Sequence, residues 1–309
     1  MSEMELRPVG RFAKHRLDEF SHSLAKRWAS CGGTYATMFT ENVMTECLFC
    51  QSAEPFSTVE HIIPESLGND ELFLRDEVCD TCQAYFGKEV EKFVLEKTPV
   101  AFWRTLLGIR TKRGRLPSVD LSQPKQQKGM LPTRHDAHDD HIGFTAHVDG
   151  STSIDIHDPK LVRELLDNSR SEFQFVFTPK VLSLFARFLV KVGLELLCST
   201  NRAAAYSPDF DDARSFARRA AGGSLWPIFY YTEGSITDLR TIEPDSEDII
   251  ERIVCYSYRL FDFRSYCVFE LGIGTDRWVL TLNGRYPTPD LVGAFPGRQL
   301  DLIWYANVK

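Results

Sequence analysis

Two pairs of cysteines constrain the fold of this chain more than any other feature. Cys47 and Cys50 form one Cys-x-x-Cys pair, and Cys79 and Cys82 form another. A two-residue gap lets both thiolates of a pair reach one ion, and two such pairs make a tetrahedral structural zinc site. The alternative is two pairs packed in a core without metal. The spacer, residues 51–78, has 28 residues, more than the ~15–20 of a simple zinc ribbon, so we predict zinc with a sizeable insert.

The composition is that of a globular protein in a reducing compartment. The chain has 309 residues, of which 43% are hydrophobic, enough for two domains. It has no apolar run near the ~20 residues that a membrane helix needs, and residues 1–20 lack the apolar stretch of a signal peptide. We therefore expect a cytoplasmic protein with no membrane partner. Among its eight cysteines, those outside the two pairs suggest buried thiols and not a disulfide framework.

The insert contains the stretch "TVEHIIPESLGN", residues 58–69. Its alternating start predicts a strand, and Pro64 and Gly68 predict the bend after it. The strand would present Glu60 and His61 side by side. A neutral imidazole is a suitable general base near pH 7, and a carboxylate is a suitable ligand for a hard divalent ion. The alternative is a strand histidine with a solvated acidic neighbour.

The segments "CLFC", "VEHIIPESLGN" and "VCDTCQAYFGKEVE" together resemble the HNH endonucleases, in the branch with a four-cysteine zinc site. The resemblance covers about residues 47–92, with a looser likeness just after it. It implies a ββα-metal (His-Me finger) fold that cuts phosphodiester bonds, mostly in DNA, with one divalent ion. On the matching positions, His61 would be the general base. Glu60 and Gln83 would hold a catalytic Mg²⁺ or Mn²⁺.

The same resemblance implies a polar residue between these motifs that orients the histidine or its loop. We assign this role to Asn69, with Asp76 as the competitor. Two residues depart from the family pattern. Glu60 stands where Asp is common, and Gln83 stands where Asn or His is expected. Gln is a neutral ligand with more rotamer freedom to lose.

These departures keep two other hypotheses open. One is a zinc-stabilised nucleic-acid-binding protein whose nuclease site has decayed. The other is a zinc-containing protein-interaction module, which predicts no salt-dependent binding to DNA.

A basic stretch follows the region of resemblance. The formal net charge of the chain is −7, but residues 104–130 hold seven bases and one acid, a local excess of +6. The centre of this stretch is "RTKRGR", with Arg110, Lys112, Arg113 and Arg115. We predict that these side chains contact the phosphates of double-stranded DNA, with affinity that falls steeply with salt. A soluble linker is the alternative.

Three histidines, His135, His138 and His141, lie at suggestive spacing in an Asp-rich polar stretch. The stretch lacks the apolar residues of a stable helix, so a solvated loop is favoured over a metal site.

The predicted fold class is α+β, a small ββα-metal zinc module followed by an α+β domain with an antiparallel sheet. We expect a helical segment in residues 1–45, with a helix at 11–30. The nuclease domain would span residues 46–97, with a helix at 83–96, and residues 98–140 would hold a helix and the basic linker.

A C-terminal α+β domain would occupy residues 141–309. The apolar side of residues 179–198 predicts a helix, and we expect a second helix at 210–221. Aromatic and β-branched runs separated by turn signals then predict the sheet. We expect this domain to select the target, to form a homo-oligomer or to bind a regulatory partner. A role in defence against foreign DNA rests on the family resemblance.

Overall fold

The computed structural model describes residues 46–53, 55–111, 114–120, 142–146, 152–156, 163, 167, 179–219, 225–233, 256–284 and 289–303. The helix predicted at 11–30, residues Lys112 and Arg113, and the three histidines at 135, 138 and 141 lie outside these ranges. Within them, helices combine with antiparallel sheets, which confirms the α+β prediction. Among these residues no helix has the length and apolar character to cross a membrane.

The N-terminal module, residues 46–98, has the order strand, strand, helix. Strand β1 (Glu60–His61) pairs antiparallel with β2 (Phe73–Leu74), so that Glu60 lies opposite Leu74 and His61 opposite Phe73. Between them a short helical turn, η1 (Glu65–Leu67), ends at Gly68, whose φ of 84° is left-handed. Only glycine adopts such a backbone at little cost, which explains the Gly in the predicted bend.

A nearly continuous helix follows the hairpin, as the apolar pattern predicts. Helix α2 (Asp80–Phe86) passes into the π-helical turn η2 (Gly87–Glu91) and then into α3 (Lys92–Lys97). The helix breaks at Thr98, whose side chain accepts from Val100 N and begins α4 (Pro99–Leu106). A hydroxyl at the N-cap and a proline in the first turn are typical helix starts.

The linker prediction is wrong for residues 118–120. These residues form strand β3 (Ser118–Asp120), which pairs with β4 (Ile142–Ala146), and β4 pairs with β5 (Thr152–Ile156). Val119 provides the physical reason, because it is buried against Ala101 of α4 and so gives the segment an apolar contact.

The described residues from 179 onward form three helices and a five-stranded antiparallel sheet. The helices are α6 (Pro179–Thr200), α7 (Arg202–Ala205) and α8 (Asp211–Arg219), with a 3₁₀ turn η3 (Pro208–Phe210) before α8. The strands, in the order β10-β6-β9-β8-β7, are β6 (Ile228–Thr232), β7 (Tyr256–Phe263), β8 (Tyr266–Ile273), β9 (Asp276–Thr281) and β10 (Asp301–Ile303). A further 3₁₀ turn, η4 (Pro289–Ala294), lies before β10.

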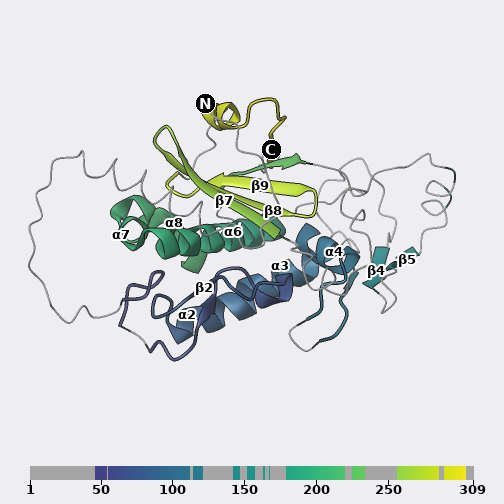
Figure 1. Cartoon of the computed structure of the whole chain (residues 1–309), viewed down its shortest axis with the longest axis horizontal. Helices are drawn as coiled ribbons and strands as arrows, with labels where there is room; N and C mark the ends of the chain where they lie inside the picture. Colours follow the sequence, from purple (N-terminus) through teal and green to yellow (C-terminus); the bar gives the residue numbers. More distant parts are fainter. Residues whose placement is uncertain are drawn as a thin grey trace, which may run out of the picture.

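Helix α6 lies at the centre of the molecule, between this sheet and the α2–α3 helix (Figure 1). It is buried on every side over most of its length, which is why its sequence is apolar almost all round. Gly193 allows the close approach to the sheet, because a Cβ there would lie 2.7 Å from Leu282 Cδ2. One hydrophobic cluster therefore joins Phe86 of the N-terminal module, Phe185 of α6 and Trp278 of the sheet.

Candidate active site

The four cysteines of the two pairs come together, as their spacing predicts. The sulfur atoms of Cys47, Cys50, Cys79 and Cys82 all lie within 4.8 Å of one another. Cys79 begins helix α2 and its sulfur accepts from the backbone N–H of Cys82 at 3.4 Å. A hydrogen bond from Cys82 lowers the pKa of Cys47 to about 4, which favours the thiolate that binds metal. Four thiol sulfurs at this separation are the donor set of a structural zinc site.

The C-terminal half contacts this cysteine cluster directly. Arg218 of α8 donates from Nε to the sulfur of Cys82 at 3.3 Å, and its guanidinium lies over the ring of Tyr85, 4.0 Å from the centroid. The Tyr206 hydroxyl donates to the backbone oxygen of Glu46, next to Cys47. The helices after residue 179 therefore support the fold of the N-terminal module.

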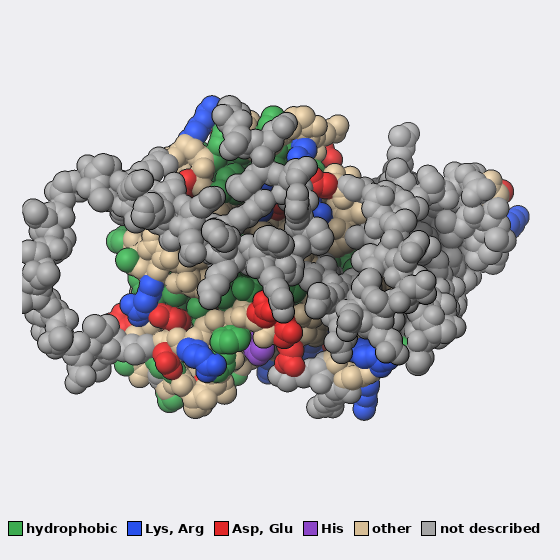
Figure 2. Space-filling model, in the orientation of Figure 1, with side chains coloured by type: hydrophobic (Ala, Val, Ile, Leu, Met, Phe, Trp, Pro, Cys, Tyr) green, Lys and Arg blue, Asp and Glu red, His purple; other side chains and the backbone are tan. Residues whose placement is uncertain are grey.

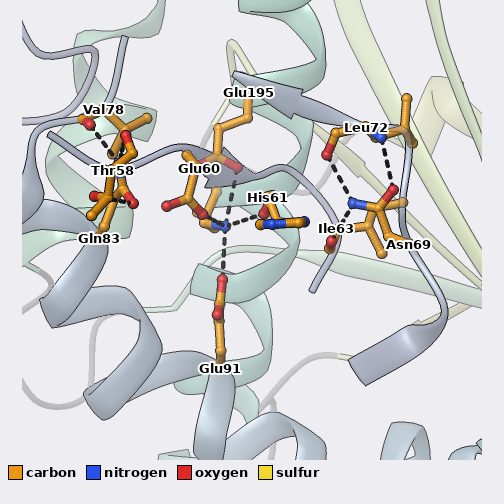
Figure 3. Close-up of polar contacts among 11 residues, drawn as sticks. Thr58, Glu60, His61, Ile63, Asn69, Leu72, Val78, Gln83, Glu91 and Glu195 are labelled. Carbon is orange, nitrogen blue, oxygen red and sulfur yellow. Dashed lines mark hydrogen bonds and ion pairs between the residues drawn. The ribbon is translucent and has the colours of Figure 1, made fainter. Parts of the chain in front are cut away.

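Glu60 is buried and ion-paired, in contrast to the solvated acidic neighbour of the alternative interpretation. It is 7% exposed, and its Oε1 lies 2.5 Å from Nζ of Lys191 on helix α6. Burial raises the pKa of the Glu60 carboxyl, and the charge of Lys191 opposes this effect. The Lys191 ammonium also pairs with Glu91 at 2.7 Å and with Glu195 at 3.1 Å. Figure 3 shows the three carboxylates arranged around this one nitrogen.

His61 lies next to this buried cluster but reaches the surface. Its side chain is half-buried, and its backbone oxygen accepts from Lys191 Nζ at 3.3 Å. The Nδ1 atom is buried, with no hydrogen-bond partner among the described residues. A histidine is visible at the molecular surface beside acidic side chains (Figure 2). A partly exposed imidazole can reach solvent, as a general base must.

Asn69 organises the loop after His61. It is 1% exposed, and its Nδ2 donates to the backbone oxygens of Ile63 at 2.6 Å and Leu72 at 2.8 Å. Its Oδ1 accepts from the backbone N–H groups of Glu71 and Leu72. The competing candidate, Asp76, is exposed. Asn69 is therefore the residue whose contacts match the predicted loop-orienting role.

Gln83 lies on helix α2, and both its amide nitrogen and its amide oxygen form hydrogen bonds (Figure 3). Nε2 donates to the backbone oxygens of Val78 at 2.8 Å and Thr58 at 3.1 Å, and Oε1 accepts from the Thr58 hydroxyl at 2.8 Å. These bonds fix the chain before β1 to the start of the helix. Glu60 Oε1 meanwhile bonds Lys191, so in this arrangement one oxygen of each predicted ligand already has a protein partner.

Two of the four predicted phosphate-binding residues can be placed. Arg110 and Arg115 are exposed on a tight turn in which Arg110 Nη1 donates to Gly114 O at 2.9 Å and Thr111 N donates to Arg115 O at 2.8 Å. On the face in Figure 2, the coloured Lys and Arg side chains are scattered. The two arginines are accessible, as the prediction requires.

Comparison with known protein families agrees with the arrangement of the hairpin and helix α2 around the cysteine cluster. Residues 30–98 match the model of the HNH endonuclease family. This segment is therefore similar to the HNH endonucleases. No curated protein and no solved structure matches the chain. The HNH segment contains the cysteine cluster, the β1–β2 hairpin and helix α2, in the strand–strand–helix order that the resemblance implies.

The main residue that sequence reasoning missed is Lys191, with its partners Glu91 and Glu195. Lys191 lies 130 positions from His61 along the chain, so no local motif joins it to the HNH segment. A signal was nevertheless present, because Lys191 and Glu195 interrupt an otherwise apolar helix four residues apart. Charges in a buried helix require partners, and a spacing of four places them on one face.

Proposed function

We propose that this protein is a metal-dependent HNH endonuclease that hydrolyses phosphodiester bonds in double-stranded DNA. The observation that carries the proposal is the match of residues 30–98 to the HNH endonuclease family. It is supported by the position of His61, at the surface end of a strand in a ββα arrangement. The proposed domain boundaries are those expected from the sequence, with the nuclease in residues 46–97.

In this proposal the protein's own side chains prepare a water molecule for attack. His61, as the general base, removes a proton from the water that attacks the phosphorus atom. Because Nδ1 of His61 is buried, the opposite edge of the imidazole ring is the one available to solvent and substrate. Asn69 holds the loop that follows the histidine, so that the ring stays near the position in which it can act.

We further propose two kinds of metal site. Cys47, Cys50, Cys79 and Cys82 would hold a structural zinc ion. Glu60 and Gln83 would hold a catalytic Mg²⁺ or Mn²⁺, whose contribution when bound is to neutralise charge on the phosphate. Glu60 would then share its carboxylate with Lys191, and Gln83 would give up its bond from Thr58. Because both side chains already have partners, we expect weak binding of the catalytic ion.

The remaining parts of the chain would serve this reaction. Arg110, Lys112, Arg113 and Arg115 would contact DNA phosphates. The C-terminal half would select the target, form a homo-oligomer or bind a regulatory partner. We place the protein in the cytoplasm, with a role in defence against foreign DNA.

Cleavage of supercoiled plasmid by the zinc-loaded protein tests the proposal. We expect nicked or linear DNA in Mg²⁺ or Mn²⁺, at millimolar ion concentrations because binding is weak. Addition of a chelator that removes only the weakly bound ion should stop the reaction. Plasmid that stays supercoiled under all ion conditions, with single-stranded DNA and RNA also intact, would contradict it.

The alternative of a decayed nuclease site depends on Gln83, which stands where the family has Asn or His. It predicts DNA binding that falls with salt but no strand breaks in excess Mg²⁺. It also predicts that Gln83→Asn creates cutting. Cutting by the unchanged protein would exclude this alternative.

A further inference from the structure

A cluster of four charged side chains is buried where the HNH segment meets helix α6. Lys191 is completely buried, as is Glu195, while the side chains of Glu60 and Glu91 are 8% and 18% exposed. The four come from three separate elements, β1, η2 and α6. An isolated buried charge is costly, and this cost is offset only by well-placed partners.

Lys191 contacts both residues of strand β1, and its shortest contact is with Glu60. Its Nζ donates to Glu60 Oε1 at 2.5 Å and to the backbone oxygen of His61 at 3.3 Å. Burial acts to lower the pKa of Lys191, but the charges of Glu195, Glu60 and Glu91 raise it well above its ordinary value. The Lys191 ammonium group therefore bonds two adjacent residues of one strand.

The hydrogen-bonded pairing of strand β1 is short. It is two residues long and pairs with a single neighbour, β2, which is equally short. A short two-stranded hairpin is marginally stable by itself. The contact from α6 reaches the backbone of the histidine from outside the hairpin.

We propose that Lys191 is a positioning residue of the nuclease site, which fixes Glu60 and the backbone of His61 and so sets the orientation of the imidazole. The proposal rests on the proposed function. It assigns to the C-terminal half a part in the chemistry, since a residue outside the matched segment completes the site. Lys191 does not touch the reacting atoms in this account.

Other contacts between α6 and the HNH segment offer matched controls. Arg187, one turn before Lys191, donates to the hydroxyl of Tyr85 and to Ala217 O at 3.0 Å, without contact to β1. Glu195 pairs with the same ammonium but does not touch the strand. If loosening the interface were enough to slow cleavage, Arg187→Met would have the same effect as Lys191→Met.

The test compares full-length, zinc-loaded Lys191→Met with Glu195→Gln and Arg187→Met in cleavage of supercoiled plasmid with Mn²⁺. For Lys191→Met we expect kcat to fall about 100-fold, since small misplacement of a catalytic group has effects of this size. The KM should change by less than about threefold, because no DNA contact is removed. Both control variants should keep kcat near that of the unchanged protein.

Two additions keep the proposal testable if Lys191→Met folds poorly or the protein does not cut plasmid. The double variant Lys191→Met with Glu195→Gln removes one charge of each sign and reduces the cost of the buried carboxylates. Hydrogen exchange of residues 58–64 gives a readout that needs no activity. We expect faster exchange there in both Lys191 variants and not in the controls.

The outcomes separate the two proposals. Lys191 variants that fold and match the controls in both kcat and exchange would overturn the positioning role. So would an equal loss of kcat in Arg187→Met. Faster exchange in a protein that cuts no substrate would support the positioning role and overturn the proposed function.

Discussion

Replacing Lys191 with Met is expected to lower the free energy of unfolding by about 3–5 kcal/mol, the usual cost of removing one partner from a buried ion pair. The side chain is completely buried, and its loss leaves the carboxylates of Glu60, Glu91 and Glu195 without a cation. Typical domains have only about 5–15 kcal/mol of stability. The variant should therefore be close to its unfolding threshold at neutral pH.

The loss of unfolding free energy in Lys191→Met should be smaller at acidic pH. Burial raises the pKa of Glu60 and, well above its ordinary value, that of Glu195 in the folded protein. The folded state then binds protons more tightly than the unfolded state, so stability falls as pH rises from about 4.5 upward. Removing Lys191 takes away the charge that opposes this effect. A carboxyl that is protonated in the folded state and ionised in the unfolded state lowers the free energy of unfolding by about 1.4 kcal/mol per pH unit.

Urea unfolding at pH 5 and pH 7.5, followed by tryptophan fluorescence with zinc present, measures both effects. Lys88→Met is the matched control, because the Lys88 side chain is 81% exposed and pairs with Glu89 at the surface. It should change stability by less than about 0.5 kcal/mol. If Lys191→Met lowered the free energy of unfolding by less than about 1 kcal/mol, or by the same amount at the two pH values, the stabilising role of Lys191 among the buried carboxylates would be refuted.

Three further predictions concern the fold around the site. Asn69→Ala should cost about 2–3 kcal/mol in urea unfolding, because it leaves buried backbone groups without their partners; a cost under about 0.5 kcal/mol would contradict its role in the loop. Cys82→Ala should abolish the one bound zinc measured by metal analysis and unfold the HNH segment, whereas Cys198→Ala, a buried thiol outside the cluster, should keep it. Gly193→Ala should destabilise by about 1–3 kcal/mol, since its Cβ would meet a leucine side chain at 2.7 Å; Gly87→Ala, with nothing within 4 Å and helical φ, should be neutral or stabilising.

The local parts of the fold were predictable from the sequence. Cysteine spacing predicted the cluster, and apolar periodicity predicted α6, α4 and the helix after Cys82. Turn residues such as Gly274, with a φ of 57°, marked the joins between strands of the C-terminal sheet. These features depend on neighbouring residues, so a single sequence contains them.

The arrangement around Glu60 was not predictable in this way. Its burial depends on Lys191, which is distant in sequence and lies in a helix whose position is set by packing against the sheet. For the same reason the bonds of Gln83 to the backbone before β1 were invisible to motif matching. Strand β3 was missed because one valine, Val119, carries its burial.

The measurement that tests the central claim most directly is the rate of plasmid nicking by His61→Ala beside Val59→Ala. Val59 lies two residues earlier on the same stretch and is 38% exposed, so its truncation controls for local disturbance. Loss of a general base typically slows a reaction by about 10²–10⁴-fold. We predict a loss in this range for His61→Ala and none for Val59→Ala. Equal nicking by both variants would show that His61 is not the base and that the account of the site is wrong.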